Sequence, residues 1–174
     1  MSHLTGTLEG FRYYFQHIDL KDKLILDVGC KDSIAGVYFK NLGLNWTGID
    51  KTPVQPQGEV ITMDMTDLKF DAKIFDIVFV CHSLEHCENP IQAIKEFRRV
   101  MKDDGYLFIS LPCYCKHHIL ESDEDHIFCF TDWQIIRLLN YCNFEKILVT
   151  QSEDGYSQHG LYNLFVTARK NGKA

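Results

Sequence analysis

A regular alternation of strand-like and helix-like segments restricts the fold of this chain more than any other feature. Short apolar runs typical of buried strands lie at residues 24–28, 46–50, 60–64, 74–80 and 106–111. Helical periodicity occupies residues 33–42, 89–101 and 131–142. Strands that alternate with helices predict a mostly parallel sheet covered on both faces. The last two strands, 145–150 and 161–168, have no helical segment between them, so they can be antiparallel neighbours.

The helix at 89–101 has the clearest boundary signals. Asn89 can cap it, Pro90 suits the first helical position, and its apolar stripe runs from Ile91 to Met101. Gly105 then predicts a left-handed turn into the next strand.

The other two helices also carry end signals. Thr131 to Gln134 is a capping box, and Asn143 is expected to end that helix in the left-handed conformation. Gly43 is expected to end the helix at 33–42. The apolar stripe predicted for the latter helix is Ile34, Val37, Tyr38 and Leu42.

Composition excludes several classes of protein. The 174 residues suit one domain over 1–174, since neither a linker nor a repeat divides them. A net charge of −6 lacks the basic footprint of a nucleic-acid binder, and the best apolar run, 74–81, is strand-sized, so no membrane span is expected. The first residues lack the layout of a secretory signal, so we expect a cytoplasmic protein whose seven cysteines are reduced.

Three carboxylates end successive strands of the predicted sheet: Asp27, Asp50 and Asp64. Parallel sheets bind ligands at the carboxyl ends of their strands, so these acids should face one edge. Gly29 opens a strand–turn–helix segment whose backbone amides favour an anionic group, and Asp50 follows it by 21 positions, where a carboxylate can accept both hydroxyls of a ribose. A single glycine in this turn disfavours a nicotinamide-type dinucleotide site, which needs three.

Five blocks in order resemble the class I S-adenosylmethionine-dependent methyltransferases, in the branch that acts on small molecules (methyltransferase type 11). They are residues 24–30, 47–50, 64–78, 84–106 and 125–144. The resemblance implies one Rossmann-like α/β domain with a seven-stranded sheet in the order 3-2-1-4-5-7-6, whose last strand is antiparallel.

The resemblance also implies a site for S-adenosylmethionine. Asp27, Gly29 and Cys30 would line its methionine part, with Lys31 near the cofactor carboxylate. Asp50, followed by Lys51, would hold the ribose. Asp64 and Met65 would contact the adenine, and Cys81 and His82 would lie beside the sulfonium.

Methyl transfer to a hydroxyl or amine needs a base, which favours histidine. His86 is the candidate base, with His82 and Glu85 beside it where the fourth strand meets its loop. Leu84-Glu85-His86 resembles the triplet of ubiquinone-biosynthesis O-methyltransferases, in which neighbouring acids are linked to a divalent metal. His82 replaces one such acid, so we expect no metal here. In the alternative interpretation Glu85 caps a helix and His86 packs against the loop.

Two further segments have competing interpretations. The cysteines and histidines of residues 113–129 include zinc-type ligands but no Cys-x-x-Cys pair, which favours a substrate loop with incidental thiols over a zinc site. The aromatic segment 11–15 (Phe11, Tyr13, Tyr14 and Phe15) is expected in a helix that packs on the sheet rather than contacting a ligand.

The resemblance predicts methyl transfer to oxygen or nitrogen of a small molecule or a carrier-bound metabolite. Lys31 stands where the family usually has glycine, and the connection 51–59 is short and Pro-rich, so we expect a loop or a single turn there. These two departures support an alternative, a catalytically inactive binding or regulatory subunit with the same fold. A small cap predicts an open site or one completed by a second subunit, which leaves a homodimer open.

Overall fold

A computed structural model of the chain describes residues 3–32, 34–53, 60–113, 125–152 and 162–172. Its elements, in chain order, are α1 (His3–Phe15), β1 (Leu24–Val28), α2 (Ile34–Asn41), β2 (Asn45–Asp50), β3 (Val60–Thr62), β4 (Phe75–Cys81), the 3-10 turn η1 (Leu84–His86), α3 (Pro90–Val100), β5 (Met101–Cys113), α4 (Asp132–Tyr141), β6 (Phe144–Ser152) and β7 (Tyr162–Lys170).

The strands form one seven-stranded sheet in the order β3-β2-β1-β4-β5-β7-β6. Strands β1 to β5 pair in parallel, and β7 runs antiparallel to both β5 and β6. This order confirms the predicted Rossmann-like α/β sheet, including its antiparallel last strand. The strand order reverses between the neighbours β1 and β4, because the chain returns from β3 across the sheet to β4, and this places a topological switch point there.

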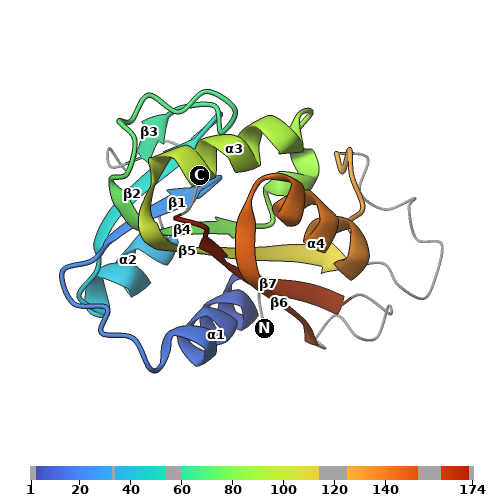
Figure 1. Cartoon of the computed structure of the whole chain (residues 1–174). Coiled ribbons are helices and arrows are strands. Elements are labelled where there is room, and N and C mark those ends of the chain that lie inside the picture. Colours follow the sequence, from blue (N-terminus) through green and yellow to red (C-terminus); the bar gives the residue numbers. More distant parts are fainter. Residues whose placement is uncertain (1–2, 33, 54–59, 114–124, 153–161, 173–174) are drawn as a thin grey trace.

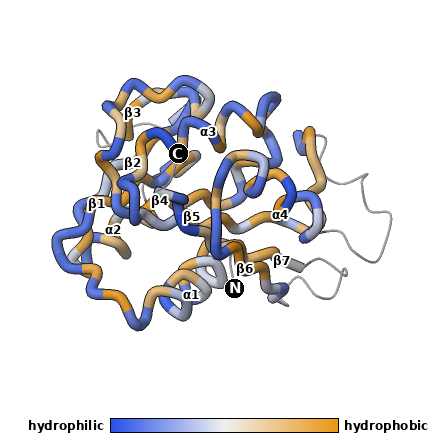
Figure 2. Tube along the Cα trace, viewed as in Figure 1, coloured by the Kyte–Doolittle hydropathy of each residue, from blue (hydrophilic) through white to orange (hydrophobic). Residues whose placement is uncertain are grey.

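Helices cover both faces of the sheet, with α1 and α2 on one side and α3 and α4 on the other (Figure 1). Alternate residues of each strand therefore enter two separate cores. Hydrophobic and hydrophilic residues alternate along the helices (Figure 2). This is expected of helices that each pack one of their faces on a sheet.

Aromatic rings build the core under α1 and α2. Phe11 of α1 packs edge-to-face on Phe39, Phe79 and Phe108, with ring centroids 5.1–5.7 Å apart. Phe79 and Phe108, on adjacent strands, stack at 5.5 Å. The prediction that the segment 11–15 packs on the sheet is confirmed for Phe11 and Phe15, which are buried, whereas Tyr13 is 68% exposed.

Local signals located most of the helix ends. The Asn89 side chain accepts from the Gln92 amide, and the capping box between Thr131 and Gln134 is formed. Gly43 and Asn143 have φ of +83° and +61°, as the left-handed helix ends require.

Two predictions about the helices are wrong. Ile34 and Val37 of α2 are 56% and 63% exposed; the helix is rotated so that Phe39 enters the aromatic core and Gly36 faces the Trp46 ring, where a Cβ would come within 2.7 Å. Ile91 of α3 is 40% exposed as well.

The boundary between α3 and β5 also differs from the prediction. The helix ends at Val100, because Met101 already pairs with Phe75 in the sheet. Gly105 therefore lies inside β5 without a positive φ. The other strands differ from their predicted ranges at the ends.

Cysteine chemistry departs from the prediction at one position. Cys113, at the end of β5, is disulfide-bonded, so the expectation that all thiols are reduced is wrong there. The other described cysteines form no disulfide: Cys30, Cys81, Cys87, Cys129 and Cys142. None of the helices within the described ranges has the length and apolar composition that crossing a membrane requires.

Truncating Phe11 to alanine should lower the free energy of unfolding by about 3–5 kcal/mol, because it removes a fully buried ring from the aromatic core. The matched control Tyr13→Ala, on the exposed side of the same helix, should change it by less than about 0.5 kcal/mol. Urea denaturation measures both. Equal effects of the two substitutions would mean that α1 does not dock on the sheet as described.

Candidate functional site

A cavity of about 430 Å³ opens at the carboxyl ends of β1 to β4, beside the topological switch point. This volume lies in the range of small-molecule sites, roughly 300–1,000 Å³. Its walls come from the ends of the strands, the segment after β3 and the start of α3. The lining residues are Val28, Gly29, Lys31, Ile49, Asp50, Lys51, Met63, Asp64, Met65, Thr66, His82, Ser83, His86, Cys87, Glu88 and Asn89.

Gly29 makes the turn that closes the base of the cavity. Its φ is +72°, and a Cβ there would come within 2.2 Å of Ser83 Oγ, so both the conformation and the space require glycine. The amides of Gly29 and Cys30 both donate to the Ile49 carbonyl, at 2.8 and 3.1 Å. These two amides are therefore engaged within the protein, whereas the anion site predicted at the start of the following helix stays a prediction.

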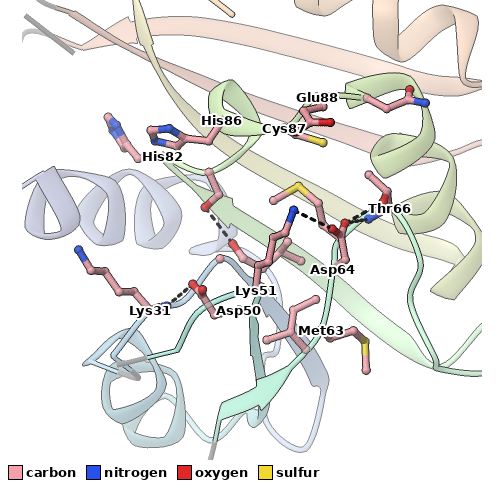
Figure 3. Close-up of a pocket in the computed structure, with 16 residues that line it drawn as sticks. Lys31, Asp50, Lys51, Met63, Asp64, Thr66, His82, His86, Cys87 and Glu88 are labelled. Carbon is pink, nitrogen blue, oxygen red and sulfur yellow. Dashed lines mark hydrogen bonds and ion pairs between the residues drawn. The ribbon is translucent and has the colours of Figure 1, made fainter. Parts of the chain in front are cut away.

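Asp50 links two turns at the rim. Its Oδ2 accepts from the Lys31 amide at 2.8 Å, and its Oδ1 accepts from the Thr52 amide at 2.7 Å. Lys31 itself has φ +51°, the conformation for which glycine is suited, at a cost of about 1–3 kcal/mol. The hydrogen bond to Asp50 helps to hold that conformation. The Lys31 ammonium points away from Asp50 and Asp64 (Figure 3).

Asp64 occupies the opposite wall. Its Oδ1 accepts from the amide and the hydroxyl of Thr66, at 2.8 and 2.7 Å, and these bonds hold its pKa below the ordinary value. Lys51 Nζ lies 3.4 Å from Asp64 Oδ2 and adds to this effect (Figure 3). Asp64 therefore presents a charged carboxylate to the cavity, which Met63 and Met65 also line.

The third predicted strand-end acid does not line the cavity. Asp27 is 1% exposed and accepts from Trp46 Nε1 at 3.0 Å. Burial raises its pKa to about 7, against the lowering effect of the indole hydrogen bond. Cys30 and Cys81 are also outside the lining, since Cys30 faces the β2 side near Gly48. Of the three acids expected to meet at this edge of the sheet, only Asp50 and Asp64 line the cavity.

The candidate catalytic residues lie around η1. His82 follows β4 with φ +47° and places Nδ1 3.6 Å from Oε1 of the buried Glu85. The backbone carbonyl of Glu85 accepts from the amides of Ile127 and Phe128, each at 3.0 Å. Glu85 is therefore behind the cavity wall, whereas His82 lines it.

His86 is exposed and lines the cavity, and it also packs against residues 125–126 of the loop, so both interpretations of this residue stay predictions. Its Nδ1 lies 2.9 Å from the Asp125 carbonyl, an acceptor, which makes Nδ1 the protonated nitrogen. The Nε2 of a neutral His86 is then the nitrogen with a free lone pair. This arrangement suits a general base.

His86 also stacks edge-to-face on His126, with ring centroids 4.7 Å apart. Together with Glu85, these two histidines bring three metal-type ligand atoms within 4.8 Å of one another. The absence of a metal at this site stays a prediction. Most of the Cys/His-rich segment 113–129 and most of the connection 51–59 lie outside the described residues.

Sequence reasoning missed half of the lining. Val28, Ile49 and Met63 are apolar residues at strand ends, Thr66 is the hydrogen-bond partner of Asp64, and Ser83, Cys87, Glu88 and Asn89 belong to the loop before α3. Asn89 was predicted as a helix cap, which it is, but not as a cavity residue. A signal for Ser83 existed, since the residue facing an obligatory glycine must be small.

Comparison with known proteins supplies independent information. Residues 26–109 match a family model described as a methyltransferase domain. The chain is 32% identical over 111 residues to a ubiquinone biosynthesis O-methyltransferase of Coxiella burnetii, covering 57% of this chain and 47% of that protein. A protein of the same name from Actinobacillus pleuropneumoniae is 30% identical over 105 residues, covering 51% of this chain and 45% of that protein. The chain spans about half the length of these relatives.

Solved structures share the whole fold. A SAM-dependent methyltransferase from Archaeoglobus fulgidus superposes with a TM-score of 0.79 at 16% identity, covering 97% of this chain and 95% of that one. The 1,6-didemethyltoxoflavin-N1-methyltransferase of Burkholderia thailandensis, solved with S-adenosylhomocysteine, gives a TM-score of 0.74 at 19% identity, covering 97% of this chain and 78% of that one.

Replacing Asp27 by asparagine should make stability less dependent on pH. The folded-state pKa of about 7 lies above the unfolded value of 3.8, so the stabilising contribution of neutral Asp27 is full below the lower value and is lost as pH rises to the upper one. Asparagine stays neutral and can still accept from Trp46. The variant should gain about 1–4 kcal/mol relative to the native chain above pH 7, and little near pH 4.

Urea denaturation across this pH range measures the difference, with Asp104→Asn, an exposed acid, as the flat control. A stability difference that is the same at all pH values would contradict the raised pKa.

Proposed function

We propose that this protein transfers a methyl group from S-adenosylmethionine to oxygen or nitrogen of a small molecule or a carrier-bound metabolite, because residues 26–109 match a methyltransferase domain model and the sheet has the class I strand order. The observation that carries the proposal is that Asp50 and Asp64, at the ends of neighbouring strands, line one cavity together with Met63 and Met65.

The residues present suit this cofactor. Each Asp50 oxygen accepts one backbone amide and retains a further lone pair, so the carboxylate can still accept the two ribose hydroxyls. Asp64 can accept from the adenine amino group, with Met65 against the ring. Gly29 and Lys31 would border the methionine end. Asp27, Cys30 and Cys81 would then lie behind the cavity lining, where Asp27 holds the Trp46 side chain by a hydrogen bond.

S-adenosylmethionine supplies an electrophilic methyl group when it is bound, so the protein has mainly to align the acceptor and remove its proton. We assign proton removal to Nε2 of His86, whose ring the Asp125 carbonyl orients. His82 and Glu85 are positioning residues, since the contact between His82 Nδ1 and Glu85 Oε1, 3.6 Å apart, joins the end of β4 to η1 and so places His86.

The acceptor class is supported by the named relatives, which are O-methyltransferases. We therefore propose a hydroxyl oxygen as the first acceptor to test, with an amine nitrogen as the second. A cytoplasmic location and a homodimer stay predictions.

Replacing Asp50 by alanine should weaken binding of S-adenosylhomocysteine about 10–100-fold, because hydrogen bonds from two ribose hydroxyls to a charged acceptor are lost. Calorimetry measures the affinity, and Asp104→Ala is the control for loss of an acid elsewhere. Retained binding in the Asp50 variant would contradict the cofactor site. If the native chain shows no melting-temperature shift at millimolar S-adenosylmethionine, the inactive-subunit alternative is favoured.

Replacing His86 by glutamine should lower the rate of methyl transfer about 10²–10⁴-fold and leave the affinity for S-adenosylhomocysteine unchanged. The assay follows release of S-adenosylhomocysteine with a panel of catechols and amines as acceptors. A base also gives the native enzyme an acidic limb in its pH–rate profile, which the variant should lack. The exposed His17→Gln is the control, and a variant as active as this control would exclude His86 as the base.

A further inference from the structure

A second cavity, of about 340 Å³, lies at the opposite edge of the sheet. It is bordered by the residues before β4, the ends of α3 and α4, and the end of β7. The seven-residue strand β4 separates it from the candidate active site by about 20–25 Å, at roughly 3.3 Å per residue. The lining residues are Ala72, Lys73, Lys95, Arg98, Arg99, Tyr141, Cys142, Asn143 and Lys170.

This lining is strongly basic in an acidic protein. Five of the 18 lysines and arginines of the chain border this one cavity, whereas the net charge of the whole chain is −6. Among the described residues, the lining contains no carboxylate. Arg98 and Arg99 belong to the last turn of α3, where basic residues favour the helix dipole. That effect does not account for Lys73, which precedes β4, or for Lys170, the last residue of β7.

Lys170 is the most unusual of the five, because it is only 6% exposed. Its Nζ donates to the Met101 carbonyl at 2.7 Å and lies 3.3 Å from Asp103 Oδ1. The same Asp103 pairs with Lys73 at 2.8 Å, so one carboxylate balances two ammonium groups. A lysine is rarely buried to this extent, and an anion above it would lower the cost of the excess charge.

The remaining cations differ in how far they are balanced. Arg99 is neutralised, since it makes a bidentate pair with Glu96 at 2.8 Å and also donates to the carbonyls of Phe70 and Leu68. Arg98 donates to the carbonyls of Asn143 and Asn171, at 3.3 and 3.0 Å, which fixes its guanidinium without neutralising it. Lys95 lies over the Tyr141 ring, 5.7 Å from its centroid.

We propose that this cavity is a binding site for a small polyanion, of the class of a pyrophosphate or triphosphate group. Lysine and arginine are the usual ligands of phosphate oxygens, and several cations around one cavity favour a multiply charged ligand over a single carboxylate. The cavity is of small-molecule size and does not have the area of a protein interface. The site is separate from the methyltransferase site and does not depend on the function proposed for it.

The test is calorimetric titration with inorganic pyrophosphate at low ionic strength, with orthophosphate as the less charged comparison. We expect binding to the native chain that weakens as salt rises, and weaker binding of orthophosphate. The single variant Lys95→Gln and the double variant Lys73→Gln/Lys95→Gln should weaken pyrophosphate binding by about tenfold for each charge removed. Lys95→Arg should retain pyrophosphate binding, because it keeps the charge. This result, together with equal melting temperatures of the native chain and the variants, separates a charge effect from a folding defect.

Two controls decide where the anion binds. Lys51→Gln alters an exposed lysine of the candidate active site, and Lys21→Gln alters an exposed lysine that lines neither cavity. Both should bind pyrophosphate as the native chain does, also with S-adenosylhomocysteine present. The proposal is overturned if millimolar pyrophosphate gives no binding, if Lys51→Gln abolishes binding in place of Lys95→Gln, or if all four lysine-to-glutamine variants bind equally.

Discussion

The close approach of Gly29 to Ser83, where β1 and β4 end side by side, is the constraint on which the candidate site depends. No side chain fits between them, since a Cβ on Gly29 would overlap the Ser83 hydroxyl. That hydroxyl in turn donates to the carbonyls of Val28 and Cys81, at 3.1 and 2.8 Å, and so ties the two strand ends together. The turn after β1 can then reach the end of β2, where the Asp50 carboxylate accepts from the Lys31 amide.

The two faces of the sheet have different roles. The aromatic core under α1 and α2 surrounds Phe79 and Phe108 and has little direct contact with the candidate site. The aliphatic core under α3 and α4 includes Leu84, and this anchors η1 and the histidines that follow β4. Packing on this second face therefore determines where His86 lies, although His86 is itself exposed.

Each edge of the parallel sheet gathers a different charge. At the carboxyl ends of the strands, Asp50 and Asp64 face a cavity with methionine walls. At the amino ends, Lys73 and the buried Lys170 face a smaller basic cavity. Residues distant in the chain meet at each edge because parallel strands all begin at one edge and end at the other.

Periodicity and capping residues alone determined the order of elements, the sheet class and most helix ends, because these depend on interactions between near neighbours in the chain. The same local rules identified Gly29, Asp50 and Asp64, since strand ends in a parallel sheet share an edge. Only the tertiary structure decided that Asp27 turns toward Trp46, that α2 buries Phe39 in place of Ile34 and Val37, and that Met101 joins β5. Each of these outcomes depends on a partner more than 15 residues away in the chain, and spacing along one segment carries no information about which distant side chain will fill a given space.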